Sequence, residues 1–484
     1  MEAAVAILVC GGLLVLGRYL GASLLVGLIA SRAFGATALL SLGFLGGSSP
    51  VIYTFFAALL VISVATRRHI WRDLGVVFRN NASAWIVTVL LIYAAVGSVI
   101  FPRLFAGQTK VFVPSRTLDG GVFEVPLAPV SGNITQMGYL VLGGVTFLAI
   151  CVLLLRRDAL DGIRKGMFAW CCLHAGMGLI DFVGKLAHLG DLLAPIRTAN
   201  YRMLIEVSQA GFPRIVGAYS EASSFGGVSL AALAFTYTYW KGSGSRFALW
   251  LSIVLLALLT LSTSSTAYAG LIVLLVPVVF SIMYAGARDR ITKKEVQIIV
   301  SIVLLLLLAA CVYLVNERYF DPLVSLFKAA IIDKADSSSG QERTYWNVES
   351  IQSFFDTAGL GVGIGSSRAS SWLVAVISQL GVAGAILMAF LVAFLMLGPR
   401  ASHSVLGTRD RLVVDSVRAC GLAGLVSSSL NSGTADPGIG FFIALAVVSM
   451  ARAASVRAQA PQRVRLDDRF GAIGVRAEPP GRPA

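Results

Sequence analysis

Apolar runs about as long as a lipid bilayer is thick recur along the whole chain, and they restrict its fold more than any other feature. A transmembrane helix needs about 20 consecutive apolar residues, and the run 297–315, QIIVSIVLLLLLAACVYLV, contains no charged residue. A transmembrane β-barrel would instead show segments of about ten residues with alternating polarity. Only 13% of the residues are charged, against roughly 25% in soluble proteins. We therefore expect an all-α polytopic membrane protein.

The apolar runs predict about twelve transmembrane helices. The first three runs are short and are interrupted by Arg18 and Arg32, so they form two or three helices. The runs lie at 3–17, 20–31, 34–47, 51–65, 84–101, 138–155, 167–186, 224–240, 247–263, 267–285, 297–315, 372–398, 413–430 and 438–451.

The segments between these runs differ in positive charge, and the difference predicts their sides of the membrane. Cytoplasmic loops of membrane proteins carry an excess of Lys and Arg. One set of segments holds 24 Lys and Arg in 94 residues, and the other holds 11 in 127. We expect the first set (66–83, 156–166, 241–246, 286–296, 399–412 and 451–484) to be cytoplasmic and the second (102–137, 187–222 and 316–370) to be periplasmic, in a bacterial inner membrane. This pattern also explains the net charge of +14 without a nucleic-acid partner.

Loop length divides the chain further. Loops longer than about 15 residues are uncommon and tend to be functional or disordered, and all three long ones fall in the periplasmic set. We expect residues 1–190 to be N-terminal transmembrane helices with one β-like or irregular loop, 102–137. Residues 191–455 would form the catalytic half, and 456–484 a disordered cytoplasmic tail. Two amphipathic stretches, Pro322–Ile332 and Tyr345–Phe355, are typical of short helices at the membrane surface.

The first group of candidate site residues lies in 187–222, just before an apolar run. It contains Arg197, Arg202 and Arg214, together with Glu206 and Glu221. Arginine binds phosphate oxygens with a planar pair of donors, and a helix N-terminus offers free N–H groups to an anion. The residues therefore predict an anion-binding corner, or alternatively a set of ion pairs that orients the loop.

The second group lies in 341–372. Arg343 is followed, after fifteen residues, by the glycine-rich stretch Gly359-Leu-Gly361-Val-Gly363-Ile-Gly365 and then by Arg368. Glycines let backbone amides approach an anion closely. The same stretch is also typical of a flexible turn before a helix.

Three further features are candidates. Asp181 and Lys185 lie four residues apart near the end of a run, so they form either a functional pair or a self-neutralising one. The stretch Leu261–Tyr268 is rich in Ser and Thr, which favours a role in helix capping. Asp436 lies in a short loop and would line the same cavity as the two groups of candidate residues. Neither the six cysteines nor the four histidines have metal-ligand spacing, so we expect no metal and no cofactor.

Residues 200–390 resemble the bacterial O-antigen ligase and polysaccharide polymerase superfamily, whose members are membrane glycosyltransferases of the GT-C type. Three pieces carry the resemblance: the stretch from Arg214 to Phe225 at the start of a run, the Ser/Thr patch 262–266, and the stretch from Arg343 to Gly384. The Arg-x15-Gly spacing at 343–359 is similar to a loop motif of such polymerases. The first 190 residues match only in topology.

This resemblance implies a mechanism and a set of residue roles. A glycan on a polyprenyl pyrophosphate would be transferred to a sugar hydroxyl of another lipid-linked repeat unit. Arg214 and Arg343 would stabilise the pyrophosphate, and Glu221 would be the catalytic base, with Glu349 and Asp356 in reserve. The further residues expected to bind substrate are Arg202, Arg368, Arg197, Glu349, Asn347, Tyr345 and Asp436. A chain-length regulator and export machinery are the implied protein partners.

One departure from the superfamily separates its branches. Ligases carry a His in the second large loop, whereas 316–370 contains none. The sequence therefore favours a polymerase of exopolysaccharide, capsule or O-antigen type. The alternatives are a ligase-type transferase and a flippase for lipid-linked oligosaccharides.

Overall fold

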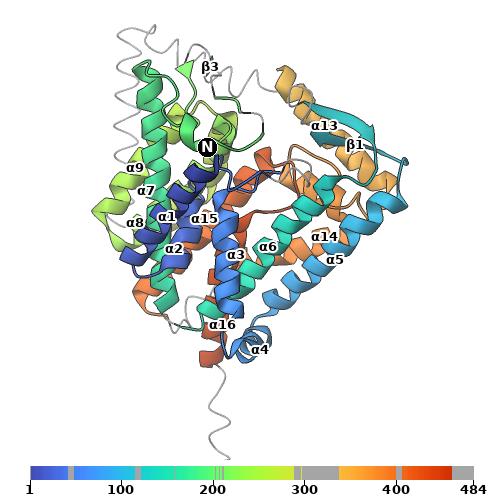
Figure 1. Cartoon of the computed structure of the whole chain (residues 1–484). Helices are drawn as coiled ribbons and strands as arrows, with labels where there is room; N and C mark the ends of the chain where they lie inside the picture. The colour runs from blue at the N-terminus through green and yellow to red at the C-terminus, as the bar shows by residue number, and fades with distance from the viewer. Residues whose placement is uncertain are drawn as a thin grey trace, which may run out of the picture.

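The computed structural model consists mainly of helices, with the ends of the bundle occupied by different elements (Figure 1). The β1–β2 hairpin, β3 and α13 lie at one end, and α4 and the C-terminal end of α16 lie at the other. Some sequence predictions fall on residues that are not described: Arg202, Glu206, the run 297–315, the stretch Pro322–Ile332, and the tail beyond residue 459. The structure describes residues 2–41, 48–114, 121–156, 158–201, 203–205, 208–209, 212–287, 296, 337–398 and 406–459.

Six of the described helices are long and apolar enough to cross a membrane, judged by length and composition. The protein is therefore membrane-embedded and predominantly α-helical, as the sequence predicts. These helices are α5 (Ala82–Leu104), α6 (Ser131–Leu153), α7 (Asp158–Leu186), α10 (Ser265–Gly286), α14 (Trp372–Leu397) and α15 (Thr408–Asn431).

Other helices coincide with predicted runs but are shorter or more polar. Apolar stretches of 10–17 residues lie in α1 (Glu2–Tyr19), α3 (Ile52–Ala65), α9 (Arg246–Leu261) and α16 (Ile439–Gln459). Helix α2 (Ser23–Ser31) is buried against α1 and α7. Helix α8 (Ala222–Ser243) has the length of a span but is less apolar. Residues 456–459, expected in the tail, continue α16.

Among the predicted apolar runs, 34–47 is contradicted by those of its residues that the structure describes. Residues 34–41 form no helix, and Ala38 instead pairs with Val51 in an isolated β-bridge. The segment is held by a hydrogen bond from the Ala36 N–H to the Ala218 carbonyl (2.9 Å) and one from the Thr37 hydroxyl to the Ile196 carbonyl (2.6 Å). Ala36 and Ala38 are buried, whereas Leu40 is exposed, and the hydrogen bonds hold the segment against the loop that contains Ile196 and Ala218.

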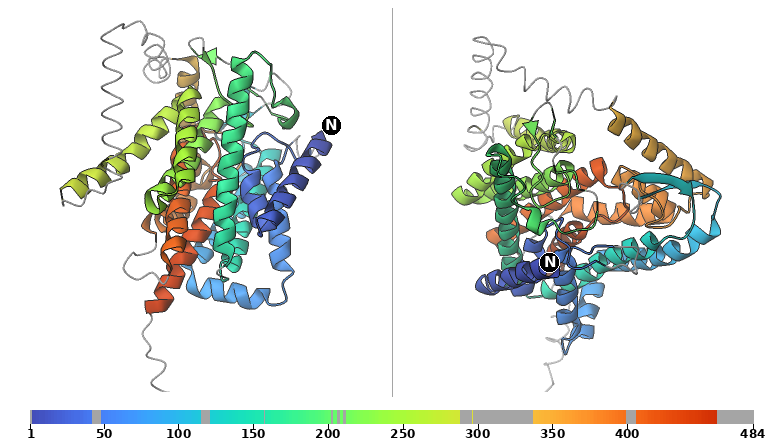
Figure 2. Two further views of the ribbon diagram at one scale, coloured as in Figure 1. Left: turned by 90° about the vertical axis from the view of Figure 1, so that its left-hand side faces the viewer. Right: turned by 45° about the horizontal axis from the view of Figure 1, so that its top comes forward.

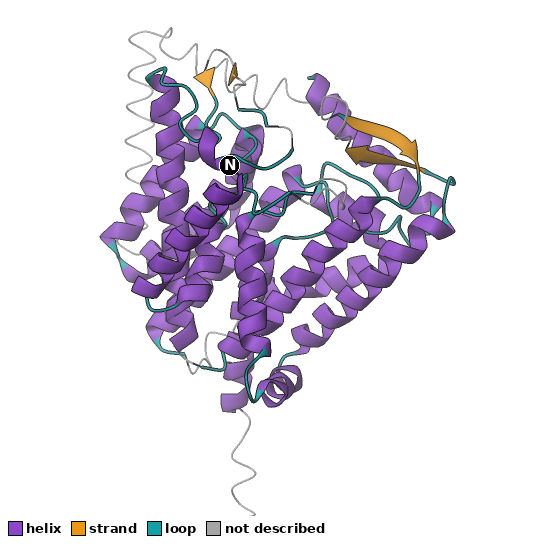
Figure 3. Cartoon of the chain, in the orientation of Figure 1, coloured by secondary structure: helices purple, strands orange, loops and turns teal. Residues whose placement is uncertain are grey.

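The long predicted loops carry the short elements of the fold. Segment 102–137 contains an antiparallel hairpin of β1 (Lys110–Pro114) and β2 (Val122–Pro126), which confirms the β-like prediction. Segment 187–222 contains the 3₁₀ turn η2 (Ala194–Ile196) and the small pair β3 (Ser208–Gln209) and β4 (Phe212–Pro213). The predicted amphipathic stretch Tyr345–Phe355 lies within α13 (Ser338–Asp356), which packs beside the hairpin (Figure 2). The strands gather at the end opposite α4 (Ile70–Asn80) (Figure 3).

Helix α8 can be more polar than a lipid-facing span because its neighbours are protein. It packs most extensively against α15 and also contacts α9 and α10. Glycines make this packing close: a Cβ at Gly227 would lie 2.0 Å from the Ser427 Oγ of α15. The Ser229 hydroxyl, fully buried on α8, lies 2.8 Å from Nε2 of His174 on α7. This contact is a polar link between two helices of the bundle.

The glycine-rich stretch fills a break in α14. At Gly381 the helix loses helical geometry, with φ +62°. The carbonyls freed at Ser378 and Gln379 accept hydrogen bonds from the Val362 and Gly363 N–H groups, at 2.8 and 3.0 Å. An unsatisfied backbone group inside a membrane costs several kcal/mol, so these bonds allow the break to exist.

Close backbone contact explains why this stretch needs glycine. Gly361, Gly363 and Gly365 all have φ between +80° and +85°. A Cβ at Gly365 would lie 2.2 Å from the Gly132 carbonyl oxygen of α6, and one at Gly361 would lie 2.7 Å from the Gly381 nitrogen. The stretch is therefore a packed wedge, and its Val362 and Gly363 amides are bonded to α14. The prediction that this glycine-rich stretch presents its backbone amides to an anion is therefore wrong for the amides of Val362 and Gly363.

We expect Gly381→Ala to destabilise the protein strongly. The new Cβ would lie 2.3 Å from the Leu360 carbonyl oxygen in a left-handed conformation, and left-handed geometry alone costs about 1–2 kcal/mol. The measurement is the thermal unfolding midpoint of purified protein in detergent. Gly138→Ala in α6 is the matched control, because no atom lies within 4 Å of its Cβ. Equal midpoints for the two variants would contradict the wedge.

Candidate functional site

Two segments from the predicted catalytic half meet at the end of the bundle that carries the hairpin. The first runs from β4 to the start of α8 and contains Arg214 and Glu221. The second comprises α13 and the stretch that leads into α14, and it contains Arg343 and Arg368. These four residues, here called the arginine cluster, come from separate parts of the chain.

The segment with Arg214 is anchored by Asp181 near the end of α7. One Asp181 oxygen accepts hydrogen bonds from the Val216 and Gly217 N–H groups at 2.7 and 3.1 Å. Lys185, paired with Asp181 at 3.0 Å, donates to the Arg214 carbonyl at 2.6 Å. The Asp181–Lys185 pair predicted from spacing is therefore present, and it positions the backbone on both sides of Ile215.

Arg197 completes this anchor. Its guanidinium is 1% exposed and donates to Asp181 at 2.9 Å, to Asp191 at 2.5 Å and to the Gly217 carbonyl at 2.9 Å. Buried charges are normally paired in this way. Its donors face protein acceptors, so the geometry favours a positioning role for Arg197 over the substrate contact expected from the sequence.

Glu221 lies at the start of α8. It is the residue before the first helical turn, in extended conformation, and its Oε1 accepts hydrogen bonds from the hydroxyls of Ser223 and Ser224. Asn431 at the end of α15 donates to the Ser223 carbonyl at 3.3 Å. Within the described part of the chain, Glu221 Oε2 accepts no hydrogen bond. The carboxylate is thus oriented through one oxygen and open through the other.

Helix α13 turns two different faces to its neighbours. One face lies toward the hairpin. On it Tyr345 donates to Glu124 at 2.7 Å, and Asp356 accepts from Thr109 at 2.7 Å. Gln352, one turn before Asp356, donates to it at 2.8 Å. Asn347, four residues after Arg343, instead accepts from the Ser370 N–H at 2.9 Å. Residues at i and i+4 share a helix face, so Arg343 is on the side that faces the Arg368 segment.

Arg368 is fixed through its backbone. Its N–H donates to the Phe112 carbonyl of β1 at 2.9 Å. Gln379 of α14 donates to the carbonyls of Ser367 and Gly433 at 2.9 and 3.1 Å. A Cβ at Gly433 would lie 2.5 Å from Arg368 Cγ, so the side chain lies directly against that glycine. The importance of Gln379 and Gly433 has no signal in the sequence, because it depends on this contact.

Electrostatic coupling shows that the four residues form one site. Burial lowers the pKa of Arg214, and nearby Arg343 lowers it further while Glu221 opposes the change. Partial burial likewise lowers the pKa of Arg368, and Arg343 lowers it further while Glu221 opposes the change. Arg368 remains accessible to water, so an incoming anion can reach it. Arg214 and Arg368 thus each lie within electrostatic range of both Glu221 and Arg343.

One donor in the arginine cluster lacks a partner. The Nε of Arg214 is buried and makes no hydrogen bond to any described residue. An unpaired buried donor costs about 1–3 kcal/mol, and an anion with several oxygens would satisfy it. The excess of cations and the orphan donor together describe a site for a multivalent anion such as a phosphate ester.

The remaining predicted residues lie elsewhere. Tyr345 joins α13 to the hairpin through Glu124, which also pairs with Lys110 at 2.7 Å. Glu349 acts electrostatically on Lys110 and Tyr345, which places it on the hairpin side. Its role and that of Asn347 in substrate binding remain predictions. Among the described carboxylates, only Glu221 influences both Arg214 and Arg368.

The Ser/Thr patch forms a corner between α9 and α10. The Ser262 hydroxyl donates to the Leu259 carbonyl at 2.7 Å, and Ser264 accepts from the Ala267 N–H at 3.4 Å. These are capping contacts, as the sequence favours. Tyr268, at the end of the patch, influences the pKa of Arg214, so the corner borders the arginine cluster. Among the described residues, no group of three His, Cys, Asp or Glu could hold a metal.

Asp436 lies in the loop between α15 and α16, three residues after the Gly433 that touches Arg368. Its Oδ1 accepts from the Gly438 N–H at 2.9 Å, and it acts electrostatically on Tyr53 at the start of α3. Burial raises its pKa from 3.8 to about 6, against the effect of the Gly438 hydrogen bond. The loop therefore touches Arg368 through Gly433 and lies near Tyr53 through Asp436.

Comparison with protein-family models gives no match, and comparison with curated proteins gives no significant match. The function is therefore inferred from the residues and from their arrangement. The arginine cluster is the feature of that arrangement with the most specific chemistry.

We expect Arg197→Ala to lower stability far more than Arg214→Ala. Removing one partner of a buried ion pair costs about 3–5 kcal/mol, whereas Arg214 is desolvated beside another cation. Chemical denaturation in detergent measures both free energies of unfolding. Arg214→Ala is a matched control, since Lys185 bonds to its backbone carbonyl. Similar losses in the two variants would show that Arg197 has no special anchoring role.

We expect Asp436→Asn to change the pH dependence of stability. The folded pKa of Asp436 lies above its unfolded value, so its contribution to stability is complete below pH 3.8 and is lost as the pH rises through about 6. Asn stays neutral and can still accept from Gly438. Above pH 6 the variant should be more stable by on the order of 2 kcal/mol. Denaturation at pH 4 and pH 8 tests this, and an identical difference at both values would refute it.

Proposed function

We propose that the protein is a polymerase of lipid-linked polysaccharide repeat units, such as those of exopolysaccharide, capsule or O-antigen. It would transfer the growing glycan from a polyprenyl pyrophosphate to a sugar hydroxyl of another lipid-linked unit. The observation that carries the proposal is the arginine cluster, in which Arg214 and Arg368 interact electrostatically with both Glu221 and Arg343 at one end of a membrane-embedded bundle. The order of the sequence motifs that resemble the polymerase superfamily supports the same reading.

The arginines would act on the leaving group. In the reaction the bond between the anomeric carbon and the pyrophosphate oxygen breaks, so negative charge accumulates on the departing pyrophosphate. Preorganised cations at a site of developing charge usually give the largest catalytic contribution. Arginine also binds phosphate oxygens in pairs. The Nε of Arg214, buried and without a partner among the described residues, is in place to donate without reorganisation.

Glu221 would act on the acceptor. As the sugar hydroxyl oxygen bonds to the anomeric carbon, its proton passes to the carboxylate. A positioned general base contributes roughly 10²–10⁴-fold. The serine hydroxyls hold one oxygen of Glu221 and leave the other for this proton. Neighbouring cations keep the carboxylate close to the leaving group that it must serve.

The wider architecture belongs to the same proposal. We assign about twelve spans in a GT-C-like arrangement, with the arginine cluster on the periplasmic side of a bacterial inner membrane and the C-terminus in the cytoplasm. Support comes from the positive charge of the opposite loops. It also comes from the structure, since the hairpin and α13 lie at the end opposite α4 (Figure 1).

The flippase alternative predicts a different use of the broken helix. In transporters, interrupted helices offer their free backbone groups to the substrate or a coupling ion. The break in α14 instead has its Ser378 and Gln379 carbonyls bonded to the glycine wedge, and Tyr93 donates to the Leu380 carbonyl at 2.9 Å. This arrangement favours an enzyme over a transporter.

Reconstitution tests the reaction type directly. Purified protein in liposomes, supplied with a polyprenyl-pyrophosphate-linked repeat unit and no nucleotide sugar, should give a ladder of lengthened glycans. Transfer of intact glycan to a different acceptor would indicate a ligase. Movement of the lipid across the bilayer without new glycosidic bonds would reject both enzymes.

We expect Glu221→Gln to abolish the ladder while the protein stays folded, because the amide keeps its shape but cannot take the proton. The readout is glycan length on a gel, with the unfolding midpoint measured in parallel. Asp73→Asn in α4, at the opposite end of the bundle, is the control, and it should keep at least half of the activity. Unchanged glycan length in Glu221→Gln would remove Glu221 as the base.

A further inference from the structure

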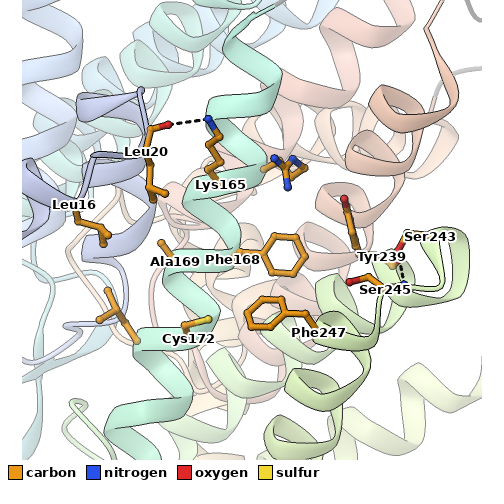
Figure 4. Close-up of a pocket in the computed structure, with 12 residues that line it drawn as sticks. Leu16, Leu20, Lys165, Phe168, Ala169, Cys172, Tyr239, Ser243, Ser245 and Phe247 are labelled. Atoms are coloured by element: carbon orange, nitrogen blue, oxygen red, sulfur yellow. Dashed lines mark hydrogen bonds between the residues drawn. The ribbon is translucent and has the colours of Figure 1, made fainter. Parts of the chain in front are cut away.

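A cavity of about 570 Å³ lies between α1, α7, α8 and α9, away from the residues of the arginine cluster. It lies where α1 ends, α8 ends at Ser243 and α9 begins at Arg246. Figure 4 shows its two sides: Leu16, Leu20 and α7 on one, and Tyr239, Ser243, Ser245 and Phe247 on the other. This feature, here called the lateral groove, has no part in the proposed reaction.

Positive charge collects at one end of the lateral groove. Arg164 and Lys165 on α7 line it, and both pair with Asp161, at 2.8 and 3.1 Å. Arg409 at the start of α15 also pairs with Asp161, at 3.2 Å. Three cations therefore share one carboxylate, which leaves an excess of positive charge beside the groove.

The two groove cations keep donors that are not used. Arg164 donates to Asp161 through Nε and Nη2, so its Nη1 has no bond to any described residue. Lys165 donates to Asp161 and to the Leu20 carbonyl (2.8 Å), and an ammonium has three donors. Each cation can therefore donate to an added anion without giving up its present partners.

The walls of the groove are apolar beyond this charged end. Phe168, Ala169 and Leu173 continue along α7 from Lys165, and Phe168 meets Phe247 of α9 with ring centroids 5.6 Å apart. At 1.5 Å per residue, these positions lie about 5–12 Å further along the helix than Lys165. A charged end and an apolar wall at this separation match the phosphate and the first acyl carbons of a phospholipid.

We propose that the lateral groove binds an anionic phospholipid, with its phosphate against Arg164 and Lys165 and one acyl chain along the Phe168 wall. Basic pockets between transmembrane helices bind lipid head groups in this way. Ser243 and Ser245, at the junction of α8 and α9, line the same groove. The Ser243 hydroxyl already donates to the Tyr239 carbonyl, whereas the Ser245 hydroxyl accepts from the Ala248 N–H and can donate to a glycerol or head-group oxygen. The lipid would hold α1 against the catalytic half of the chain. This proposal does not depend on the glycan reaction.

Lipid selectivity tests the proposal. Delipidated protein in detergent is titrated with dioleoylphosphatidylglycerol and, separately, with dioleoylphosphatidylcholine, and native mass spectrometry counts the bound molecules. We expect one phosphatidylglycerol to bind at least tenfold more tightly than phosphatidylcholine. Arg164→Gln and Lys165→Gln should each reduce that preference about fivefold. Equal affinity for the two lipids in the unaltered protein would overturn the proposal.

Three variants separate specific binding from general effects of charge or misfolding. Arg79→Gln removes an exposed cation from α4, outside the groove, and should leave the preference unchanged. Asp161→Asn removes the competing carboxylate and should increase the preference. Ala169→Phe fills the apolar wall and should weaken both lipids while the charges remain. A loss with Arg79→Gln as large as that with Lys165→Gln, or a decrease with Asp161→Asn, would contradict the site.

Discussion

The insertion of the glycine wedge into the break of α14 is the constraint on which the rest of the site depends. A helix inside a membrane cannot lose its hydrogen bonds unless other groups replace them. Here the replacement comes from Val362 and Gly363, which lie a few residues before Arg368. The same contacts that make the break tolerable therefore determine where the chain emerges and where that arginine can lie. Gln379, at the break itself, holds both Ser367 and Gly433.

The second half of the site depends on a different kind of support. Arg214 is positioned by a buried network of charges around Asp181. In this network Lys185 donates to the Arg214 carbonyl, Asp181 accepts from the Val216 N–H, and Arg197 donates to the Gly217 carbonyl. Burial of charge is costly unless every partner is in place, so this network is rigid once formed. In the arginine cluster, Arg368 is thus held by backbone packing and Arg214 by a network of ion pairs. Neither support uses the guanidinium groups of these two residues.

The apolar runs predicted most of the helices because membrane spans are set by length and polarity alone. They failed at 34–41, where the Ala36 N–H bonds to the Ala218 carbonyl and the Thr37 hydroxyl bonds to the Ile196 carbonyl. Motif order brought Arg214, Glu221, Arg343 and Arg368 to attention, and the structure brings them together. The role of Arg197 could not be read from sequence, because Asp181, Asp191 and Gly217 approach it only in the folded chain. Similarly, the glycines resembled an anion-binding loop until their contacts with α14 were visible.

The contacts of the β1–β2 hairpin have a consequence for how such a chain can evolve. The hairpin belongs to the N-terminal half, yet Thr109 bonds to Asp356, and Phe112 contacts the Ser367–Arg368 segment. Asn133 at the start of α6 bonds to the Ser366 hydroxyl at 2.7 Å. A recombination event near residue 190 would join a hairpin and a wedge that had not been selected together. The two halves must therefore be inherited as a unit, and substitutions on either side of that boundary should coevolve.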